Sequence, residues 1–134
     1  HKFFRFGIST VAYSDTHIQL MAAAVLSPQD VLVVISNSGS SIEILDAVSI
    51  AKENGAQVIV ITRHDSPLAQ LGDCVLTVAV QEDSSRYTPM VSRLLQLAVV
   101  DILAIGLALR LGETVSFQLE KGKRSISRHR VEEE

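Results

Sequence analysis

Hydrophobic residues gather along the chain in short continuous runs that are typical of buried strands. The runs VLVVIS, QVIVIT and CVLTVAV show almost no alternation between apolar and polar positions. A strand that is covered on both faces, as in a parallel sheet, has this pattern. A shorter run, rich in β-branched and small residues, precedes them. We therefore predict strands at Ser9–Tyr13, Val31–Ile35, Gln57–Thr62 and Cys74–Val80.

Helical periodicity fills the segments between these runs. Asp15 or Thr16 is a suitable N-cap for the first helix, and the pair Asn54-Gly55 is a common C-terminal stop for the second. Proline at the first helical position favours a short third helix. The predicted helices are Asp15–Leu26, Ser40–Asn54 and Ser66–Leu71. This alternation predicts an α/β fold with a doubly wound, mostly parallel sheet flanked by helices.

The last predicted helix, Thr88–Leu111, is apolar almost all round. Such a helix must be buried on more than one side, so we expect one side to face a second subunit in a homodimer or higher homo-oligomer. Its apolar run, Leu94–Leu109, holds sixteen residues and includes Gln96 and Asp101. A membrane span needs about twenty apolar residues, so no span is predicted here.

Asp101 is a single carboxylate within this apolar stretch. An unpaired buried charge is energetically expensive. We therefore expect Asp101 to meet a partner, such as Arg93 or a backbone donor, or to lie at a helix edge.

The segment from residue 113 to residue 134 differs in composition. Five basic residues within ten positions are followed by three glutamates, and the charges of the whole segment cancel. Contact with a nucleic-acid backbone is one interpretation of the basic cluster. A solvated, partly disordered tail is the interpretation that we favour, because no aromatic residue lies among the basic ones. The cluster comprises Lys121, Lys123, Arg124, Arg128 and Arg130.

Composition and charge narrow the class of protein. The 134 residues are enough for one domain, and 47% of them are hydrophobic. A net charge of −3 argues against a protein that mainly coats nucleic acid or an anionic membrane. A single cysteine, Cys74, excludes an intramolecular disulfide and is expected in the core, and the four histidines lack metal-ligand spacing. No charged-then-apolar leader opens the chain, which predicts a cytoplasmic protein.

A cluster of small polar residues between a buried strand and a helix is the strongest candidate site. It reads Ser36-Asn37-Ser38-Gly39-Ser40-Ser41. Ligands in open α/β sheets bind at the carboxyl ends of strands, and a helix N-terminus there attracts phosphate. Gly39 allows a tight turn, while the hydroxyls and the Asn37 amide can donate to phosphate oxygens. The alternative is an ordinary polar turn with Ser40 as the helix N-cap.

Other polar residues carry weaker predictions. The chain has neither a Walker A loop nor the GxGxxG fingerprint, so nucleotide hydrolysis and nicotinamide chemistry have no support. Glu43 is a candidate general base, although a first-turn carboxylate that complements the helix dipole is the preferred interpretation. His64 and Asp65 follow a strand, and a loop role is expected for them. Ser84 and Arg86 are candidate ligand contacts in the segment after the last strand, with Glu82, Asp83 and Ser85 beside them.

The segment VLVVISNSGSSIEILDAVSIAKENGAQVIVIT, followed by SPLAQLGDCVL, resembles the SIS (sugar isomerase) fold. The phosphosugar loop of that family has the pattern Ser-x-Ser-x-x-Ser/Thr, which Ser36, Ser38 and Ser41 match. SRLLQLAVVDILAIGLALR resembles the final helix of SIS domains in RpiR-type bacterial transcriptional regulators. HKFFRF and VAYSDTHIQLMAAAVLSPQDV are similar to their HexR-like branch. The resemblance covers residues 1–112, which it implies form the domain, and leaves 113–134 as the tail.

The resemblance implies a flavodoxin-like fold and a domain that senses a phosphosugar without turning it over. The effector would be a sugar acid phosphate such as 2-keto-3-deoxy-6-phosphogluconate, with His17 approaching it and no cofactor required. DNA would be bound only through an attached helix-turn-helix domain. The family's first strand and its loop precede the segment that HKFFRF matches, so that strand is expected to be lacking here. A phosphosugar isomerase and a dimerisation module without ligand remain the alternatives.

Overall fold

The computed structural model describes residues 2–78, 80 and 90–127. Contacts divide the chain into two compact units. We call Tyr13–Val99 the sheet unit, and His1–Ala12 together with Val100–Glu134 the helical unit.

The sheet unit contains the predicted parallel sheet. Its three strands stand in the order β1-β2-β3, with Val33 of β1 opposite Ile59 of β2 and Ile59 opposite Cys74 of β3. The predicted α/β class is therefore confirmed. The elements are α1 (Thr16–Ala24), β1 (Val31–Ile35), α2 (Ile42–Glu53), β2 (Gln57–Thr62), α3 (Pro67–Leu71) and β3 (Cys74–Thr77).

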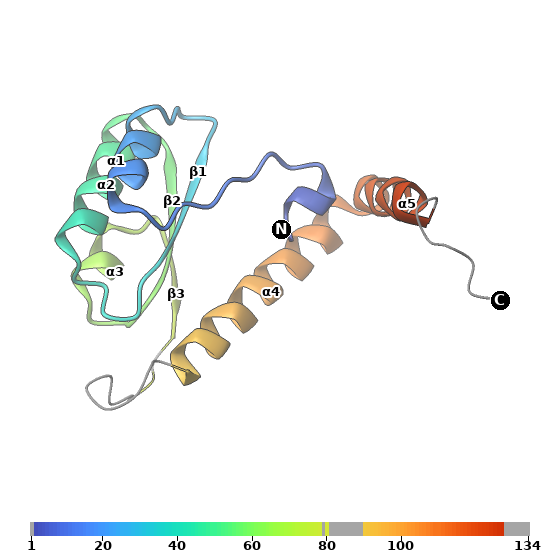
Figure 1. Ribbon diagram of the computed structural model, residues 1–134. Helices are drawn as coiled ribbons and strands as arrows, with labels where there is room; N and C mark the ends of the chain where they lie inside the picture. Colours follow the sequence, from blue (N-terminus) through green and yellow to red (C-terminus); the bar gives the residue numbers. More distant parts are fainter. Residues whose placement is uncertain (1, 79, 81–89, 128–134) are drawn as a thin grey trace. The chain divides into compact units, whose positions relative to one another are not determined.

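One face of the sheet is covered by helices α1, α2 and α3 (Figure 1). Parallel connections are right-handed, so successive connections from β1 to β2 to β3 place their helices on the same face. Val48 of α2 and Leu68 of α3 pack there against Val58 and Val60 of β2, and all four are fully buried. The core of the sheet unit therefore lies between β2 and these helices.

Residues 9–13, which the sequence predicts to be a strand, do not form one. They are exposed, and residues 9–12 belong to the helical unit by their contacts. Their hydrogen bonds to other residues are local, such as that from the Gln19 side chain to the Tyr13 carbonyl. Local composition favours a strand, but a strand also needs a neighbour to accept its backbone hydrogen bonds. The prediction is therefore wrong for this segment.

Cys74 also differs from its prediction. It is exposed, as the first residue of the edge strand β3. An edge strand has a neighbour on one side only, which leaves its side chains less covered than those of β2.

The helical unit holds the 3₁₀ helix η1 (Phe4–Phe6), residues 100–111 of α4 (Val91–Leu111), and α5 (Glu113–Ser127). Gly112 turns the chain between the last two with a φ of 57°. The sequence predicts a solvated, partly disordered tail after residue 112, whereas the structure has helix α5 over most of that segment. Val115 is buried and Leu119 half-buried one turn later, so an apolar stripe accompanies the basic composition that guided the prediction.

Helix α4 has 21 residues and so extends beyond the sixteen-residue run Leu94–Leu109. By length and composition alone it is suited to cross a membrane, which for a single helix is weak evidence. Asp101 near its middle is paired with the Lys2 ammonium at 2.6 Å. The expectation of a partner for Asp101 is confirmed, although the partner is Lys2 rather than Arg93.

An ion pair joins the end of α2 to the start of β3. The Lys52 ammonium lies 2.6 Å from Asp73 Oδ1, and Asp73 Oδ2 accepts a hydrogen bond of 2.8 Å from the Val58 backbone N–H. The hydrogen bonds from Lys52 and from Val58 hold the pKa of Asp73 below its ordinary value of 3.8. A carboxylate that is stabilised in the folded state adds stability above its unfolded pKa.

We expect the unfolding free energy to fall as the pH drops below about 3.8, because Asp73 then takes up a proton in the unfolded chain but stays ionised in the folded chain, where its pKa is lower. Asp73→Asn is expected to lower the melting temperature at pH 7 and to weaken this pH dependence. Hydrogen bonds from Ser27 also lower the pKa of Asp30, so part of the pH dependence should persist in Asp73→Asn. Denaturant unfolding from pH 5 to pH 2.5 measures both effects, with Asp46→Asn as the control. An Asp73→Asn curve parallel to that of the parent would contradict the assignment.

Candidate functional site

The polar loop of residues 36–41, here called the serine loop, joins the carboxyl end of β1 to α2. The Ser36 N–H donates to the Ile61 carbonyl of β2 at 3.1 Å. The Gly39 N–H donates to Ser36 Oγ at 3.1 Å, and the Ser40 N–H donates to Ser38 Oγ at 3.4 Å. Two of the loop's hydroxyls therefore accept hydrogen bonds from its own backbone and hold it in one shape.

Gly39 is the point at which the serine loop meets the next connection of the sheet. Its φ is +61°, and a Cβ atom on it would lie 2.5 Å from Thr62 Oγ1. Thr62 and Ser66 are fully buried, and their hydroxyls lie 3.1 Å apart. The Leu68 N–H closes the contact by donating to the Gly39 carbonyl at 3.0 Å. Glycine is required here both for the backbone conformation and for the space.

The N-terminus of α2 opens onto the serine loop without a side-chain cap. Its N-cap is Ser41, which makes no side-chain capping hydrogen bond, so Ser40 is not the N-cap. By contrast, Asp15 caps α1 by accepting from the Ile18 N–H at 3.0 Å. The first N–H groups of a helix have no partner within it and favour an anion. Glu43 is exposed in the first turn, where the helix dipole favours a carboxylate.

Asn37 adds a polar atom without a partner in the same loop. Its Oδ1 atom is buried and accepts no hydrogen bond in the structure. Buried polar atoms are normally satisfied, so a donor from a bound molecule would have a place at this atom. The oxygen and nitrogen of an asparagine amide can exchange by a flip, which would present a donor instead.

Arg63 reaches the serine loop although the sequence does not single it out. Its Nη2 atom donates to the Ser38 carbonyl at 3.4 Å, from an exposed side chain at the carboxyl end of β2. The feature of the sequence that could have identified Arg63 is its position, one residue before His64 and Asp65, which the sequence analysis does name. Those two bond each other at 2.7 Å on the surface, in agreement with a loop role.

Of the remaining predicted site residues, His17 is the one that the structure describes. His17 is exposed in the first turn of α1, and its role stays a prediction. Ser84 and Arg86 lie outside the described residues, as do Glu82, Asp83 and Ser85. Within the ranges that the structure describes, no group of three histidine, cysteine or acidic residues is placed to hold a metal ion.

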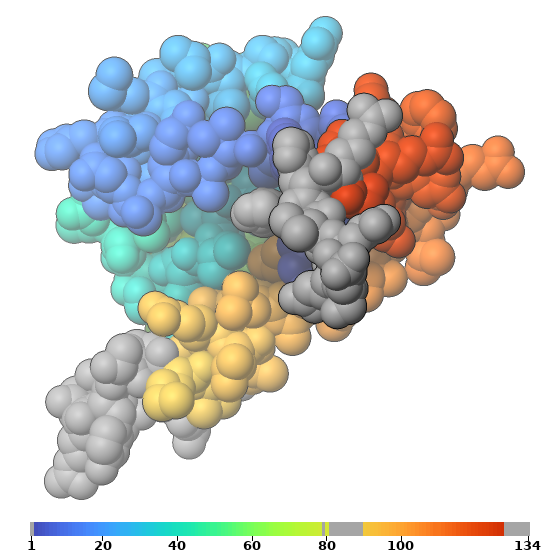
Figure 2. Space-filling view, turned by 45° about the vertical axis from the view of Figure 1, so that its right-hand side comes forward, coloured from blue at the N-terminus to red at the C-terminus, as the bar shows by residue number. Residues whose placement is uncertain are grey.

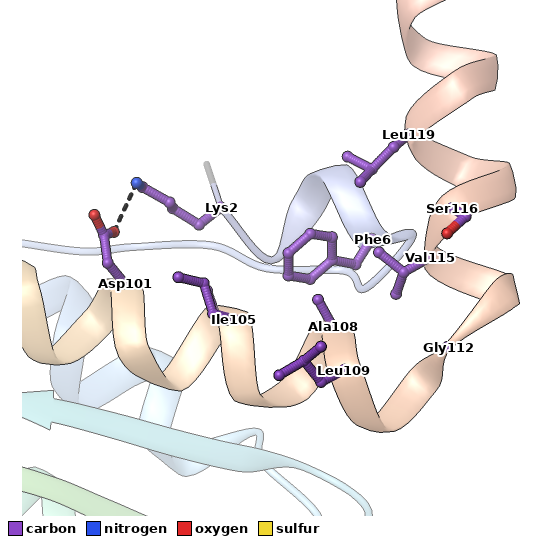
Figure 3. Close-up of a pocket in the computed structure, with 11 residues that line it drawn as sticks. Lys2, Phe6, Asp101, Ile105, Ala108, Leu109, Gly112, Val115, Ser116 and Leu119 are labelled. Atoms are coloured by element: carbon purple, nitrogen blue, oxygen red, sulfur yellow. Dashed lines mark ion pairs between the residues drawn. The ribbon is translucent and has the colours of Figure 1, made fainter.

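The helical unit contains a cavity of about 440 Å³ that its own residues line. Its wall is mostly apolar, with Phe6 between α4 and α5 and the Lys2–Asp101 ion pair at one end (Figure 3). None of the described residues that the sequence predicts to bind a ligand lines it. The chemistry of the serine loop, rather than the size of this cavity, identifies the candidate site.

The family follows from a comparison of the whole chain with known domains. A model of the SIS domain matches residues 1–106. The chain belongs to the SIS domain family. The match includes the sheet unit and the serine loop, where the predicted Ser-x-Ser-x-x-Ser pattern lies.

Curated relatives place this SIS domain near two kinds of protein. It is 40% identical over 126 residues to the HTH-type transcriptional regulator HexR of Pseudomonas aeruginosa, which is 94% of this chain and 44% of that regulator. It is 42% identical over 114 residues to the bifunctional protein glk of Burkholderia orbicola, which is 85% of this chain and 18% of that protein. The predicted resemblance to HexR-type regulators is confirmed, and the chain spans less than half of the regulator.

Solved structures agree with the fold. The NanR protein of Vibrio vulnificus complexed with ManNAc-6P matches 97% of this chain and 49% of its own, with a TM-score of 0.85 and 24% identity. The sugar isomerase domain of an RpiR transcription factor from Sphaerobacter thermophilus matches 92% of this chain and 68% of its own, with a TM-score of 0.70 and 25% identity. The three-stranded parallel sheet with its helices is therefore that of SIS domains.

Replacing Gly39 tests the contact between the serine loop and the turn after β2. Gly39→Ala is expected to destabilise the chain by about 2–5 kcal/mol, because a positive φ is costly for alanine and the methyl group overlaps Thr62 and Ser66. Gly122→Ala is the control, since no atom lies within 4 Å of its added Cβ in α5. It should be neutral or stabilising by up to about 1 kcal/mol. Equal unfolding free energies for the two variants would contradict the close packing at Gly39.

Proposed function

We propose that this SIS domain binds a phosphorylated sugar or sugar acid without transforming it, and thereby regulates DNA binding by a domain attached to it. The observation that carries this proposal is the serine loop, which Gly39 fixes against the turn after β2 beside the uncapped start of α2. A preformed set of neutral donors at a helix N-terminus is a suitable receptor for a phosphate group.

The hydrogen bonds within the loop leave its donors available. A serine hydroxyl that accepts from a backbone N–H still has one O–H to donate. This is the state of Ser36 and Ser38, which accept from Gly39 and Ser40. The Ser41 hydroxyl does not cap α2. Three hydroxyls and the free N–H groups of the first turn of α2 can therefore surround three phosphate oxygens.

Similarity to HexR over almost the whole chain supports a regulatory role rather than an enzymatic one. Ligand binding and DNA binding would then be coupled between two parts of one protein. The effector class that this favours is a sugar acid phosphate such as 2-keto-3-deoxy-6-phosphogluconate, sensed in the cytoplasm. His17, Ser84 and Arg86 would contact the remainder of the sugar.

An isomerase would need a base that moves a proton between adjacent carbons of the sugar. Glu43 is the candidate within the serine-loop region. It is exposed, and its position in the first turn of α2 already has a structural explanation in the helix dipole. Sensing without turnover is therefore the function that the geometry supports best.

A stripe of exposed apolar side chains on α4 supports a homodimer. Exposed apolar side chains recur along the helix at alternating intervals of four and three residues, which is the spacing of a helix that packs along a second helix. Figure 2 shows part of the surface of α4, in yellow and orange. Leu95, Ile102 and Leu109 are 42%, 69% and 78% exposed. Each would contribute about 1–2 kcal/mol if a second copy covered it. The stripe comprises Val91, Leu95, Ala98, Ile102, Ile105 and Leu109.

Removing a single hydroxyl tests phosphate binding by the loop. Ser38→Ala is expected to weaken binding of 2-keto-3-deoxy-6-phosphogluconate by about 10–100-fold, because a hydrogen bond to a charged group contributes about 1.5–3 kcal/mol. Ser49→Ala is the matched control, since this α2 hydroxyl bonds the Leu45 carbonyl outside the loop. Isothermal titration calorimetry measures both, and gluconate without phosphate should not bind the parent chain. Equal affinities for the two variants would contradict the role of the loop.

A charged residue in the stripe tests the dimer. Ile102→Glu is expected to give a monomer at micromolar concentration, because it would bury an unpaired carboxylate in the interface. Leu97→Glu, at an apolar position outside the stripe that is 56% exposed, should leave the dimer intact. Light scattering with size exclusion gives the mass of each. A monomeric parent chain, or dimers of both variants, would contradict the stripe as the interface.

A further inference from the structure

We propose that Arg63 is the residue that recognises the charge of the ligand's phosphate group, an inference that rests on the function proposed above. The Arg63 guanidinium touches the serine loop directly, through the bond from Nη2 to the Ser38 carbonyl at 3.4 Å. A phosphate group seated on the Ser38 hydroxyl and the start of α2 would therefore lie beside this cation.

The backbone of Arg63 is fixed relative to the loop by Ser66. The Arg63 carbonyl accepts from Ser66 Oγ at 2.9 Å and from the Ser66 N–H at 3.3 Å. Ser66 is fully buried, and it is one of the two residues against which Gly39 packs. The start of the arginine side chain is thus held by the same contact that holds the loop, while its exposed end is able to turn towards a ligand.

The serine loop contains no cation of its own to balance the charge of a phosphate group. Its own donors are neutral, and Glu43 adds a negative charge to the first turn of α2. A phosphate monoester carries a charge of about −1.5 to −2 at pH 7. Of the lysine and arginine residues described in the sheet unit, Lys52 is paired with Asp73 and Arg93 lies on α4. Arg63 is the described cation that contacts the loop.

Guanidinium geometry suits this role. Arginine has five N–H donors in a planar fork, and the bond to Ser38 uses one of them. The others can form paired bonds with two phosphate oxygens. The ligand class that this predicts is a phosphate monoester in its dianionic form, with affinity that rises as the phosphate loses its second proton near pH 6.

The test compares Arg63→Gln, Arg63→Lys and Arg93→Gln in the full chain. The probes are inorganic phosphate and 2-keto-3-deoxy-6-phosphogluconate, titrated by calorimetry at pH 5.5 and pH 7.5 and at two salt concentrations. Arg63→Gln is expected to weaken binding at pH 7.5 by about tenfold, to reduce the difference between the two pH values, and to reduce the effect of salt. Arg63→Lys should keep part of the affinity and the pH dependence. Arg93→Gln removes the same charge elsewhere and should behave like the parent.

The outcomes separate this inference from the function on which it rests. If the parent chain binds neither probe, the proposed function is overturned and the role of Arg63 with it. If the parent binds but Arg63→Gln binds equally well, the role of Arg63 alone is wrong. If Arg63→Gln and Arg63→Lys weaken binding equally while the pH dependence persists, the arginine only holds Ser38 in place, which also overturns the charge-recognition role.

Discussion

The candidate site depends on one close contact, that of Gly39 with Thr62 and Ser66. It joins the connection after β1 to the connection after β2, two segments that are brought together only because the strands pair in parallel. Hydrogen bonds from Leu68 to Gly39 and from Ser66 to Arg63 surround this contact. A residue with a side chain at position 39 would separate the two connections. The shape of the serine loop is therefore a property of the packed sheet edge rather than of its own sequence.

This contact also explains how a loop of small polar residues becomes a receptor. A flexible loop would lose conformational freedom on binding and so bind weakly. Here the backbone is already held, the hydroxyls of Ser36 and Ser38 already accept internal hydrogen bonds, and their hydrogens remain to be donated. The free N–H groups at the start of α2 add the field of the helix dipole. The same packing sets Arg63 at the rim of the loop, so that neutral donors and a positive charge share one edge of the sheet.

Local patterns in the sequence are sufficient to predict much of the sheet and the position of the serine loop. Continuous apolar runs located β1, β2 and β3, and the alternation with helices gave the parallel sheet. The serine loop stood out by composition and position. The two failures that matter most here concern contacts between distant parts of the chain. Residues 9–13 have the composition of a strand but no partner strand, and Asp101 is paired with Lys2 from the other end of the chain. The contact of Arg63 with Ser38 spans 25 residues and needs the register of β1 and β2 before it can be seen.

The central claim is that the serine loop and Arg63 together receive a phosphate group. Backbone amide chemical shifts of the isotopically labelled chain, followed by NMR during titration with a phosphorylated sugar acid, test this most directly. The account predicts that the largest shifts fall on residues 38–44 and on Arg63, with little change in α5. Shifts concentrated instead around Phe6, Asp101 and Val115, which line the cavity of the helical unit, would contradict the account, as would no shifts at all.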